Sequence, residues 1–461
     1  PINVPVSLRR SRVDARGVLM NNDAAETLVP LPGTTLAPRR EIFAWAMYDF
    51  ANSGYTTVVL TAVFNQYFVH VVAANMGSSR GTGTFYWTIA IAITNALILL
   101  SAPVLGAIAD HRAYKKRFLA VTTIGCVVFT ALLANVGPGD IWLAMIVVIL
   151  SFFMFGTGEN LIASFLPEIA PQRDMGRISG YGWSLGYLGG LLVLGVCLAY
   201  VTWAQARGAT ASQYVPVTML ITAAIFALAA VPTFVWLPER ATRSPLPPGQ
   251  GYFVLGFARV KHTLQHVRHF RDLFRFLVSL TVYYCGIYTV VVLAAVYARA
   301  VMGFGTGEIL LLILVINVTA ALGALAFGQM QDWLGSLRTL ALTLALWIIA
   351  LAVAYFSESR AVFWLVGNLI GVALGSSQSA GRALVGQFAP PARAGEFFGL
   401  WGLASKLAAI IGPLSYGAIA YWSDGDHRLA LLSTTAFFIV GLLLLLAVNE
   451  SRGRAAAHTK R

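Results

Sequence analysis

The sequence predicts an all-α integral membrane protein in which twelve transmembrane helices form two pseudo-symmetric halves of six helices. Of its 461 residues, 58% are apolar and only 11% are charged, whereas soluble domains carry roughly 25% charged residues. Apolar stretches of the ~20 residues needed to cross a bilayer recur along the whole chain. Short motifs of the first half also reappear in the second half. Together these observations exclude a soluble fold.

The twelve candidate spans follow one another with short polar connections, apart from one longer break in the middle of the chain. Each is a nearly continuous apolar run, as expected for a helix surrounded by lipid and by other helices. In chain order they cover residues 42–73, 84–109, 117–136, 140–166, 177–201, 214–237, 273–299, 304–329, 339–356, 361–388, 396–422 and 428–448.

The basic residues predict the orientation of the chain in the membrane. With both termini on the cytoplasmic side, 25 of the 32 Lys and Arg residues fall in cytoplasmic segments, as the positive-inside rule requires. The net charge of +13 therefore indicates topology and contact with membrane lipids, not binding to nucleic acid. We expect a multi-pass protein of the cell inner (plasma) membrane. The basic residues predicted outside stand alone, at Arg80, Arg207, Arg299, Arg360 and Arg428.

The polar segments divide the chain into five parts. In the central linker, apolar residues recur every three to four positions from Phe253 to Val267, which predicts an amphipathic helix on the membrane surface. Its three histidines fit a solvated basic face better than a metal site, since no acidic ligand lies beside them. The parts are a disordered cytoplasmic tail (1–41), a first six-helix half (42–237), the linker (238–272), a second six-helix half (273–448) and a cytoplasmic tail (449–461).

Internal repeats relate the two halves. The segment from Gly54 to Phe64 (GYTTVVLTAVF) returns as IYTVVVLAAVY from Ile287 to Tyr297, so that Tyr55 matches Tyr288. The sequence GAIAD at 106–110 likewise returns as GQMQD at 328–332. A parallel repeat of six helices is typical of secondary transporters whose site lies between the halves.

Glycines and acidic residues in these repeats carry a family resemblance. The pattern Gly328, Asp332, Gly335 and Arg338 resembles the loop signature of the major facilitator superfamily. The copy in the first half has Gly106 and Asp110 but lacks the second glycine, and Lys116 stands at the position of the arginine. In that superfamily these residues hold neighbouring helix ends together, and the resemblance therefore implies a conformational gate at all seven positions.

Three longer segments resemble one branch of that superfamily. They are WAMYDFANSGYTT (45–57), LPEIAPQRDMGRISGYGWSLGYLGG (166–190) and EFFGLWGLASKLAAIIGPLSYG (396–417). Together they are similar to the vacuole-effluxer-like group, which includes fungal autophagy-related amino-acid exporters and bacterial relatives. One departure concerns Cys285, because relatives commonly have Asp before the following glycine. No role that depends on that Asp carries over to this chain.

Four ionisable residues fall inside predicted spans at similar depths. Asp49 and Glu159 lie in the first half, whereas Arg382 and Lys406 lie in the second. Charged groups at membrane depth are costly and usually face a cavity or a partner, so they are functional candidates. Burial also raises the pKa of a carboxyl group, which makes Asp49 or Glu159 a candidate proton carrier.

Two interpretations of these charges remain open. A zwitterionic solute bound between the halves would place its carboxylate on a basic residue and its amine on an acidic one. Alternatively, the four residues form salt bridges that close the cytoplasmic side. Neutral residues on the same spans would assist either role, and Asp49 and Asn52 share a helix face predicted to line the cavity. The candidate substrate-binding or coupling residues are Asp49, Asn52, Tyr55, Glu159, Asn160, Gln378, Arg382 and Lys406.

The predicted fifth span carries a ridge of small residues. Gly182, Gly186 and Gly190 are spaced four residues apart, a pattern that favours close packing of helices over ligand contact. Trp183 and Tyr187 beside the ridge are more consistent with aromatic packing than with a place on the transport pathway.

Function follows from the repeats, the intramembrane charges and the resemblance. The leading prediction is secondary active transport of a small polar or zwitterionic, amino-acid-like solute by alternating access, with export favoured and protons as candidate coupling ions. The alternatives are a larger amphipathic solute, such as a peptide, cell-wall fragment or drug, or a receptor that does not transport. The chain lacks a phosphate-binding loop, a zinc helix and a nucleophile elbow, so we expect neither an enzyme nor a cofactor. Its three cysteines fall within spans and suggest no metal site. We expect a monomer.

Overall fold

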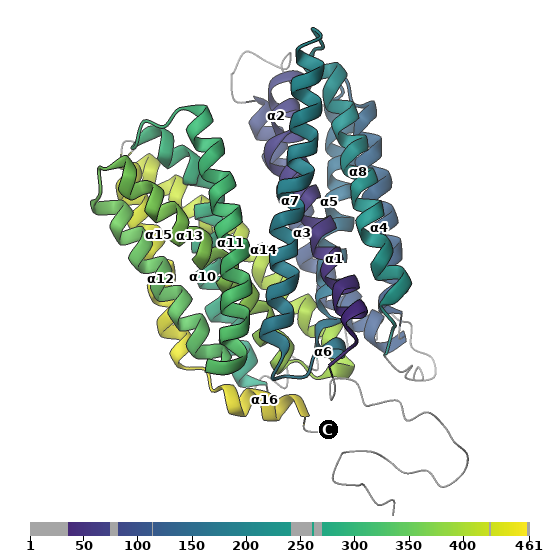
Figure 1. Ribbon diagram of the computed structural model, residues 1–461, viewed down its shortest axis with the longest axis vertical. Helices are drawn as coiled ribbons and strands as arrows, with labels where there is room; N and C mark the ends of the chain where they lie inside the picture. Colours follow the sequence, from purple (N-terminus) through teal and green to yellow (C-terminus); the bar gives the residue numbers. More distant parts are fainter. Residues whose placement is uncertain are drawn as a thin grey trace, which may run out of the picture.

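The computed structural model describes residues 36–73, 82–112, 114–240, 261, 270–423 and 426–458, which form two helical bundles side by side (Figure 1). The prediction of an all-α membrane fold is confirmed. The first bundle contains α1 (Arg39–Tyr55), η1 (Thr56–Ala62), α2 (Phe64–Tyr67), η2 (Phe68–Val72), α3 (Thr82–Arg112), α4 (Lys115–Leu132), α5 (Ile141–Ala163), α6 (Leu166–Ile169), α7 (Met175–Gln205) and α8 (Ala211–Trp236). The second contains α10 (Arg271–Ala300), α11 (Thr306–Leu334), α12 (Ser336–Phe356), α13 (Arg360–Phe388), α14 (Ala394–Trp422), α15 (His427–Leu446) and α16 (Glu450–His458).

Within the described residues, eleven of the twelve predicted spans correspond to helices that are long enough and apolar enough to cross a membrane. The remaining span, 42–73, consists of α1, η1, α2 and η2 in succession, of which η1 and η2 are π-helical. Polar side chains support the wider turns, because Thr61 Oγ1 donates to Thr56 O and Asn65 Nδ2 donates to Leu60 O, each five residues earlier. Such π-turns are frequent at functional sites.

The prediction also covered the segments outside the spans, namely the two tails and the central linker. The predicted amphipathic helix at 253–267, the linker histidines and the N-terminal tail up to residue 35 lie outside the described residues, apart from Lys261. The segment 449–461, predicted only as a tail, contains the helix α16. Apolar periodicity did not reveal α16 because its sequence, ESRGRAAAH, is short and polar.

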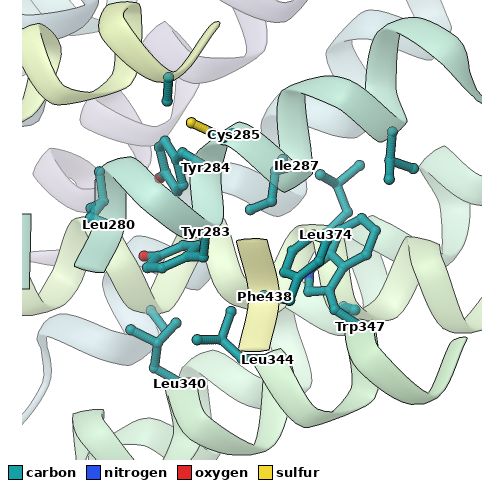
Figure 2. Packing of buried hydrophobic residues seen from close by; sticks show 14 of the residues in the cluster. Leu280, Tyr283, Tyr284, Cys285, Ile287, Leu340, Leu344, Trp347, Leu374 and Phe438 are labelled. Atoms are coloured by element: carbon teal, nitrogen blue, oxygen red, sulfur yellow. The ribbon is translucent and has the colours of Figure 1, made fainter. Parts of the chain in front are cut away.

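Each half has apolar cores of its own. In the second half, Tyr283, Leu344, Trp347 and Phe438 bring together α10, α12 and α15, and all four side chains are buried (Figure 2). The rings of Trp347 and Phe438 stack with centroids 4.8 Å apart. Because most of this burial occurs within a half, each half is suited to move as a unit.

The pseudo-symmetry extends to a pair of glutamates that the sequence reading did not single out. Glu239, just after the last span of the first half, accepts a hydrogen bond from Lys115 N (2.6 Å) at the start of α4. Glu450 follows the last span of the second half and accepts from Ser336 N (3.1 Å) and Leu337 N (3.0 Å) at the start of α12. Each carboxylate thus satisfies free N–H groups at a helix N-terminus.

The glycine ridge of α7 packs against α1, as predicted. A Cβ atom on Gly186 would lie 2.9 Å from Ser53 Oγ, and one on Gly190 would lie 2.9 Å from Thr57 Oγ1. The absence of side chains on these glycines lets α1 and α7 approach closely next to Asp49.

The two halves meet chiefly along α3 with α14 and α7 with α11, and α7 with α13 and α5 with α14 add further contacts. The bundles lie closer together near α6 and α16 than at their other end (Figure 1). At Gly328 the contact is between backbones, because a Cβ atom there would lie 2.8 Å from Gly176 O. Gly106 similarly faces the Gly395 carbonyl with no room for a side chain. These glycines therefore allow the halves to close at one end.

Candidate functional site

The four intramembrane charges form two ion pairs, each of which joins the two halves. Arg382 Nη1 on α13 lies 2.6 Å from Asp49 Oδ2 on α1. Lys406 Nζ on α14 lies 3.5 Å from Glu159 Oε2 on α5. The sequence placed these residues at one depth, and the structure shows which acid faces which base.

The Asp49–Arg382 pair is the more buried of the two. The side chains of Asp49 and Arg382 are 12% and 4% exposed. Arg382 also donates from Nε to Ser179 Oγ (3.1 Å) and from Nη2 to Ser179 O (2.9 Å) on α7. Its guanidinium lies over the rings of Trp45 (4.6 Å) and Trp183 (5.3 Å). With so many partners, Arg382 is well placed to tie α1, α7 and α13 together.

The Glu159–Lys406 pair lines a polar cavity between the halves. Glu159 is 30% exposed and Lys406 is 9% exposed, and their separation of 3.5 Å leaves the pair loosely held. The polar lining residues of the cavity come from α5, α13 and α14 and are Glu159, Asn160, Gln378, Ser405 and Lys406.

Four aromatic residues complete the lining. They come from α7, α10 and α14 and are Trp183, Tyr284, Tyr288 and Trp401. Trp183 is therefore on the cavity, where the sequence favoured aromatic packing instead. In the sequence, Tyr284 and Tyr288 lie four residues apart on the helix equivalent to the first span. This spacing places them on one helix face and could have indicated that both line the cavity. Figure 2 shows Tyr284 next to the buried Tyr283, and the two rings meet edge to face.

The predicted substrate residues thus divide into two groups. Glu159, Asn160, Gln378 and Lys406 line the cavity, whereas Asp49 and Arg382 form the separate buried pair. Two further candidates lie away from the cavity among the described residues. Asn52 is buried with its Oδ1 unpartnered, and the Tyr55 hydroxyl is paired with Ser151 Oγ at 2.8 Å inside the first half. The shared helix face of Asp49 and Asn52 does not line this cavity, because close packing of α7 on α1 intervenes.

The predicted gate residues Asp110 and Asp332 each cap a helix of the opposite half. Asp110, at the end of α3, accepts hydrogen bonds from Gly395 N (3.0 Å) and Glu396 N (2.9 Å) at the start of α14. Asp332, near the end of α11, accepts from Gly176 N (2.8 Å) and Arg177 N (3.0 Å) at the start of α7. A carboxylate is favourable at a helix N-terminus because free N–H groups and the helix dipole meet it there. We call these two contacts the aspartate caps.

The basic partner of Asp110 is Lys115, one residue before the position that the sequence pattern indicated. Lys115 Nζ lies 2.9 Å from Asp110 Oδ1 and 2.8 Å from Glu168 Oε1, and the side chain is 1% exposed. Lys116 instead contacts Glu239 through its backbone N at 3.4 Å. The chain turns between α3 and α4, so spacing alone did not determine which lysine points inward.

The second-half gate differs in detail. Gly335 joins α11 to α12 with φ of +94°, a conformation that favours glycine. Arg338 is exposed, and within the described part of the chain it has no hydrogen bond or ion pair. Among the described residues, Asp332 has its helix cap but no buried basic partner like Lys115.

Replacing Asp332 with asparagine is expected to weaken closure at this end. Hydrogen bonds to a charged group contribute about 1.5–3 kcal/mol each, and the amide would lose that charge. Double electron–electron resonance between spin labels at Arg117→Cys and Ser451→Cys should show a shift toward longer distances; the native cysteines are buried. Glu308→Gln, which removes an exposed carboxylate paired with Arg360 within one half, is the control. Unchanged distances in Asp332→Asn would contradict a closing role.

Known proteins with the same architecture include solved transporters of the major facilitator superfamily. The proton:xylose symporter XylE superposes with a TM-score of 0.69 at 16% identity, covering 90% of this chain and 96% of that one. The superfamily transporter FucP in the outward conformation gives a TM-score of 0.68 at 13% identity, covering 89% and 98%. These similarities confirm the fold.

Sequence relatives share most of their length with this chain. An uncharacterized MFS-type transporter, YxiO of Bacillus subtilis (strain 168), is 29% identical over 410 residues, which cover 88% of this chain and 94% of YxiO. Autophagy-related protein 22-1 of Penicillium rubens is 22% identical, covering 83% and 78%. The family model described as "Vacuole effluxer Atg22 like" matches residues 37–458. The chain therefore belongs to the Atg22-like vacuole effluxer family of major facilitator secondary transporters, and it is a multi-pass membrane protein.

Proposed function

We propose that the protein moves a small zwitterionic, amino-acid-like solute across the membrane by alternating access, with export as the favoured direction. The observation that carries this proposal is the cavity between the halves, where Glu159 and Lys406 offer one acidic and one basic group. A zwitterion would place its ammonium group at Glu159 and its carboxylate at Lys406. Membership in a family of effluxers supports export.

The lining of the cavity supports a solute held between the halves. The cavity is bounded by side chains of both halves, as alternating access requires of a central site.

The two aspartate caps support an outward-facing arrangement. Both caps lie at one end of the molecule, next to the segments in which most Lys and Arg residues fall. By the positive-inside rule we infer that this end faces the cytoplasm, with both termini on the same side. The bacterial relative YxiO supports a location in the plasma membrane. On this basis the cytoplasmic side is closed and the solute exchanges with the opposite side.

We propose protons as the coupling ions. Glu159 is the better candidate carrier, because its side chain is 30% exposed and only loosely paired with Lys406. Asp49 is held at 2.6 Å by Arg382 and would have to leave that pair before it could accept a proton. A solute that separates Glu159 from Lys406 would free this carboxylate to take part in coupling.

Flux measurements in proteoliposomes test this proposal. A panel of amino acids, short peptides and sugars is first screened for ligands that raise the melting temperature of the purified protein, since a ligand bound to the native state stabilises it. Stabilising zwitterions should then drive counter-flow of the labelled compound, faster with a pH gradient than without. Stabilisation without flux would indicate a receptor. Stabilisation by apolar compounds alone would refute the zwitterion site.

A further inference from the structure

We propose that the cationic end of the transported zwitterion is a fully alkylated ammonium group, as in betaines. This inference rests on the proposed function and narrows the chemistry of the same site. It is carried by two features of the cavity: the aromatic rings that form much of its wall, and the kinds of hydrogen-bonding atoms among them.

The aromatic wall suits an ammonium group without N–H bonds. Trp183 belongs to the first half, and Tyr284, Tyr288 and Trp401 belong to the second, so rings face the cavity from both sides. Tyr284 and Tyr288 lie edge to face with centroids 5.9 Å apart, and their faces are therefore turned in different directions. Recognition of quaternary ammonium groups by several aromatic rings is a common use of cation–π attraction.

One neutral acceptor on the cavity is already engaged. A primary ammonium group brings three N–H donors, each of which needs an acceptor when it is buried. Gln378 Oε1 already accepts from the Tyr187 hydroxyl. The acceptors left among the lining side chains are the Glu159 carboxylate, the Asn160 carbonyl and the hydroxyl oxygens of Ser405, Tyr284 and Tyr288. A quaternary ammonium group needs none of these hydrogen bonds and interacts with the charge and the rings.

Unpartnered N–H groups suit the other end of the zwitterion. Asn160 Nδ2 and Trp183 Nε1 are buried and have no hydrogen-bond partner in the described part of the chain, and both residues line the cavity with Lys406. Asn160 is itself only 6% exposed. Buried donors without partners carry a free-energy cost that an incoming acceptor removes. A carboxylate bound by Lys406, Asn160 and Trp183 would satisfy them.

Titrations with a methylation series test the inference on the full-length protein in nanodiscs. Glycine, N-methylglycine, N,N-dimethylglycine and N,N,N-trimethylglycine differ only at nitrogen, and choline provides the ammonium without the carboxylate. Dissociation constants from calorimetry should fall along the series by about tenfold or more. Choline should bind at least about tenfold more weakly than trimethylglycine, because it lacks the charge-assisted bonds to the carboxylate.

Variants of the aromatic wall provide the matched control. Tyr288→Phe keeps the ring and removes the hydroxyl, so it should retain the preference for trimethylglycine. Tyr288→Leu and Trp401→Leu should reduce that preference while leaving the melting temperature of the unliganded protein comparable with that of Tyr288→Phe. If Trp401→Leu fails to fold, the comparison of Tyr288→Leu with Tyr288→Phe alone tests whether the rings set the preference for trimethylglycine.

Two outcomes separate this inference from the function on which it rests. If glycine or another primary amino acid binds as tightly as trimethylglycine, the alkylated-ammonium inference is overturned, whereas the zwitterion site stands. If no zwitterion binds, neither from the amino-acid panel nor from the methylation series, but uncharged solutes do, both proposals fail. Equal binding of choline and trimethylglycine would overturn the assignment of Lys406, Asn160 and Trp183 to a carboxylate.

Discussion

Replacing Arg382 with methionine is expected to lower the free energy of unfolding by about 3–5 kcal/mol, because it leaves a buried carboxylate without its counter-ion. Asp49 is 12% exposed and has its short ion pair with Arg382. The substitution also removes two hydrogen bonds to Ser179 and the contacts with Trp45 and Trp183. Unfolding in mixed micelles with increasing denaturing detergent measures the change.

The double variant Asp49→Asn/Arg382→Met is the control for this prediction. Replacing both members of a buried ion pair with uncharged residues is often nearly neutral, so most of the lost stability should return.

Lys406→Met tests whether the two ion pairs contribute differently to stability. Its partner Glu159 is 30% exposed, and we expect a loss below about 1 kcal/mol, as for partly solvated pairs. Equal losses in Arg382→Met and Lys406→Met would show that the two pairs do not differ in role.

Lys406→Gln should have the largest effect on transport. If Lys406 binds the carboxylate of the solute, its loss removes a desolvated charge pair and should weaken binding by about 2–5 kcal/mol, or roughly 30-fold to several thousand-fold. The uptake rate in proteoliposomes at subsaturating solute should fall by a similar factor. The melting temperature of the unliganded protein should change little.

Lys406→Arg separates charge from shape in this prediction. Arginine keeps the positive charge, so it should retain much more binding than glutamine does, although the larger guanidinium crowds Phe152, which lies 5.4 Å from Lys406 Nζ. Arg275→Gln, near the start of α10, removes a positive charge that is bonded to Ala447 O and lies away from the cavity, and it should leave binding unchanged. Normal binding by Lys406→Gln would contradict the carboxylate assignment.

Much of the fold could be predicted from the sequence because hydropathy and repetition act over long stretches. Each span needs only an apolar run of sufficient length, and the bilayer itself then imposes the helix. The first span is the exception, since its threonines and Asn65 support π-turns that apolar length does not reveal. The helix α16 was missed because it is short and polar. It is held in place by tertiary contacts, such as the hydrogen bonds that Glu450 accepts from the start of α12.

The candidate site could be predicted only in part. The presence of four charges at one depth was visible in the sequence, but not their pairing, because two acids and two bases permit more than one arrangement. Asp49 pairs with Arg382 because Gly182 of α7 leaves room for both side chains beside Trp45. Trp401 and the two tyrosines were overlooked because aromatic residues are common throughout the apolar spans. Only their place on the cavity distinguishes them from core residues.

The sequence by itself determined the membrane environment, the helical class, the repeat and the set of buried charges, because each depends on composition or spacing along the chain. The tertiary structure decided which residues meet: Lys115 and not Lys116 at Asp110, Glu159 and not Asp49 on the cavity. The physical reason is that a contact between halves depends on how each helix is rotated about its axis. Close approach of backbones at glycines such as Gly106 and Gly328 sets that rotation, and it involves residues more than a hundred positions apart in the chain.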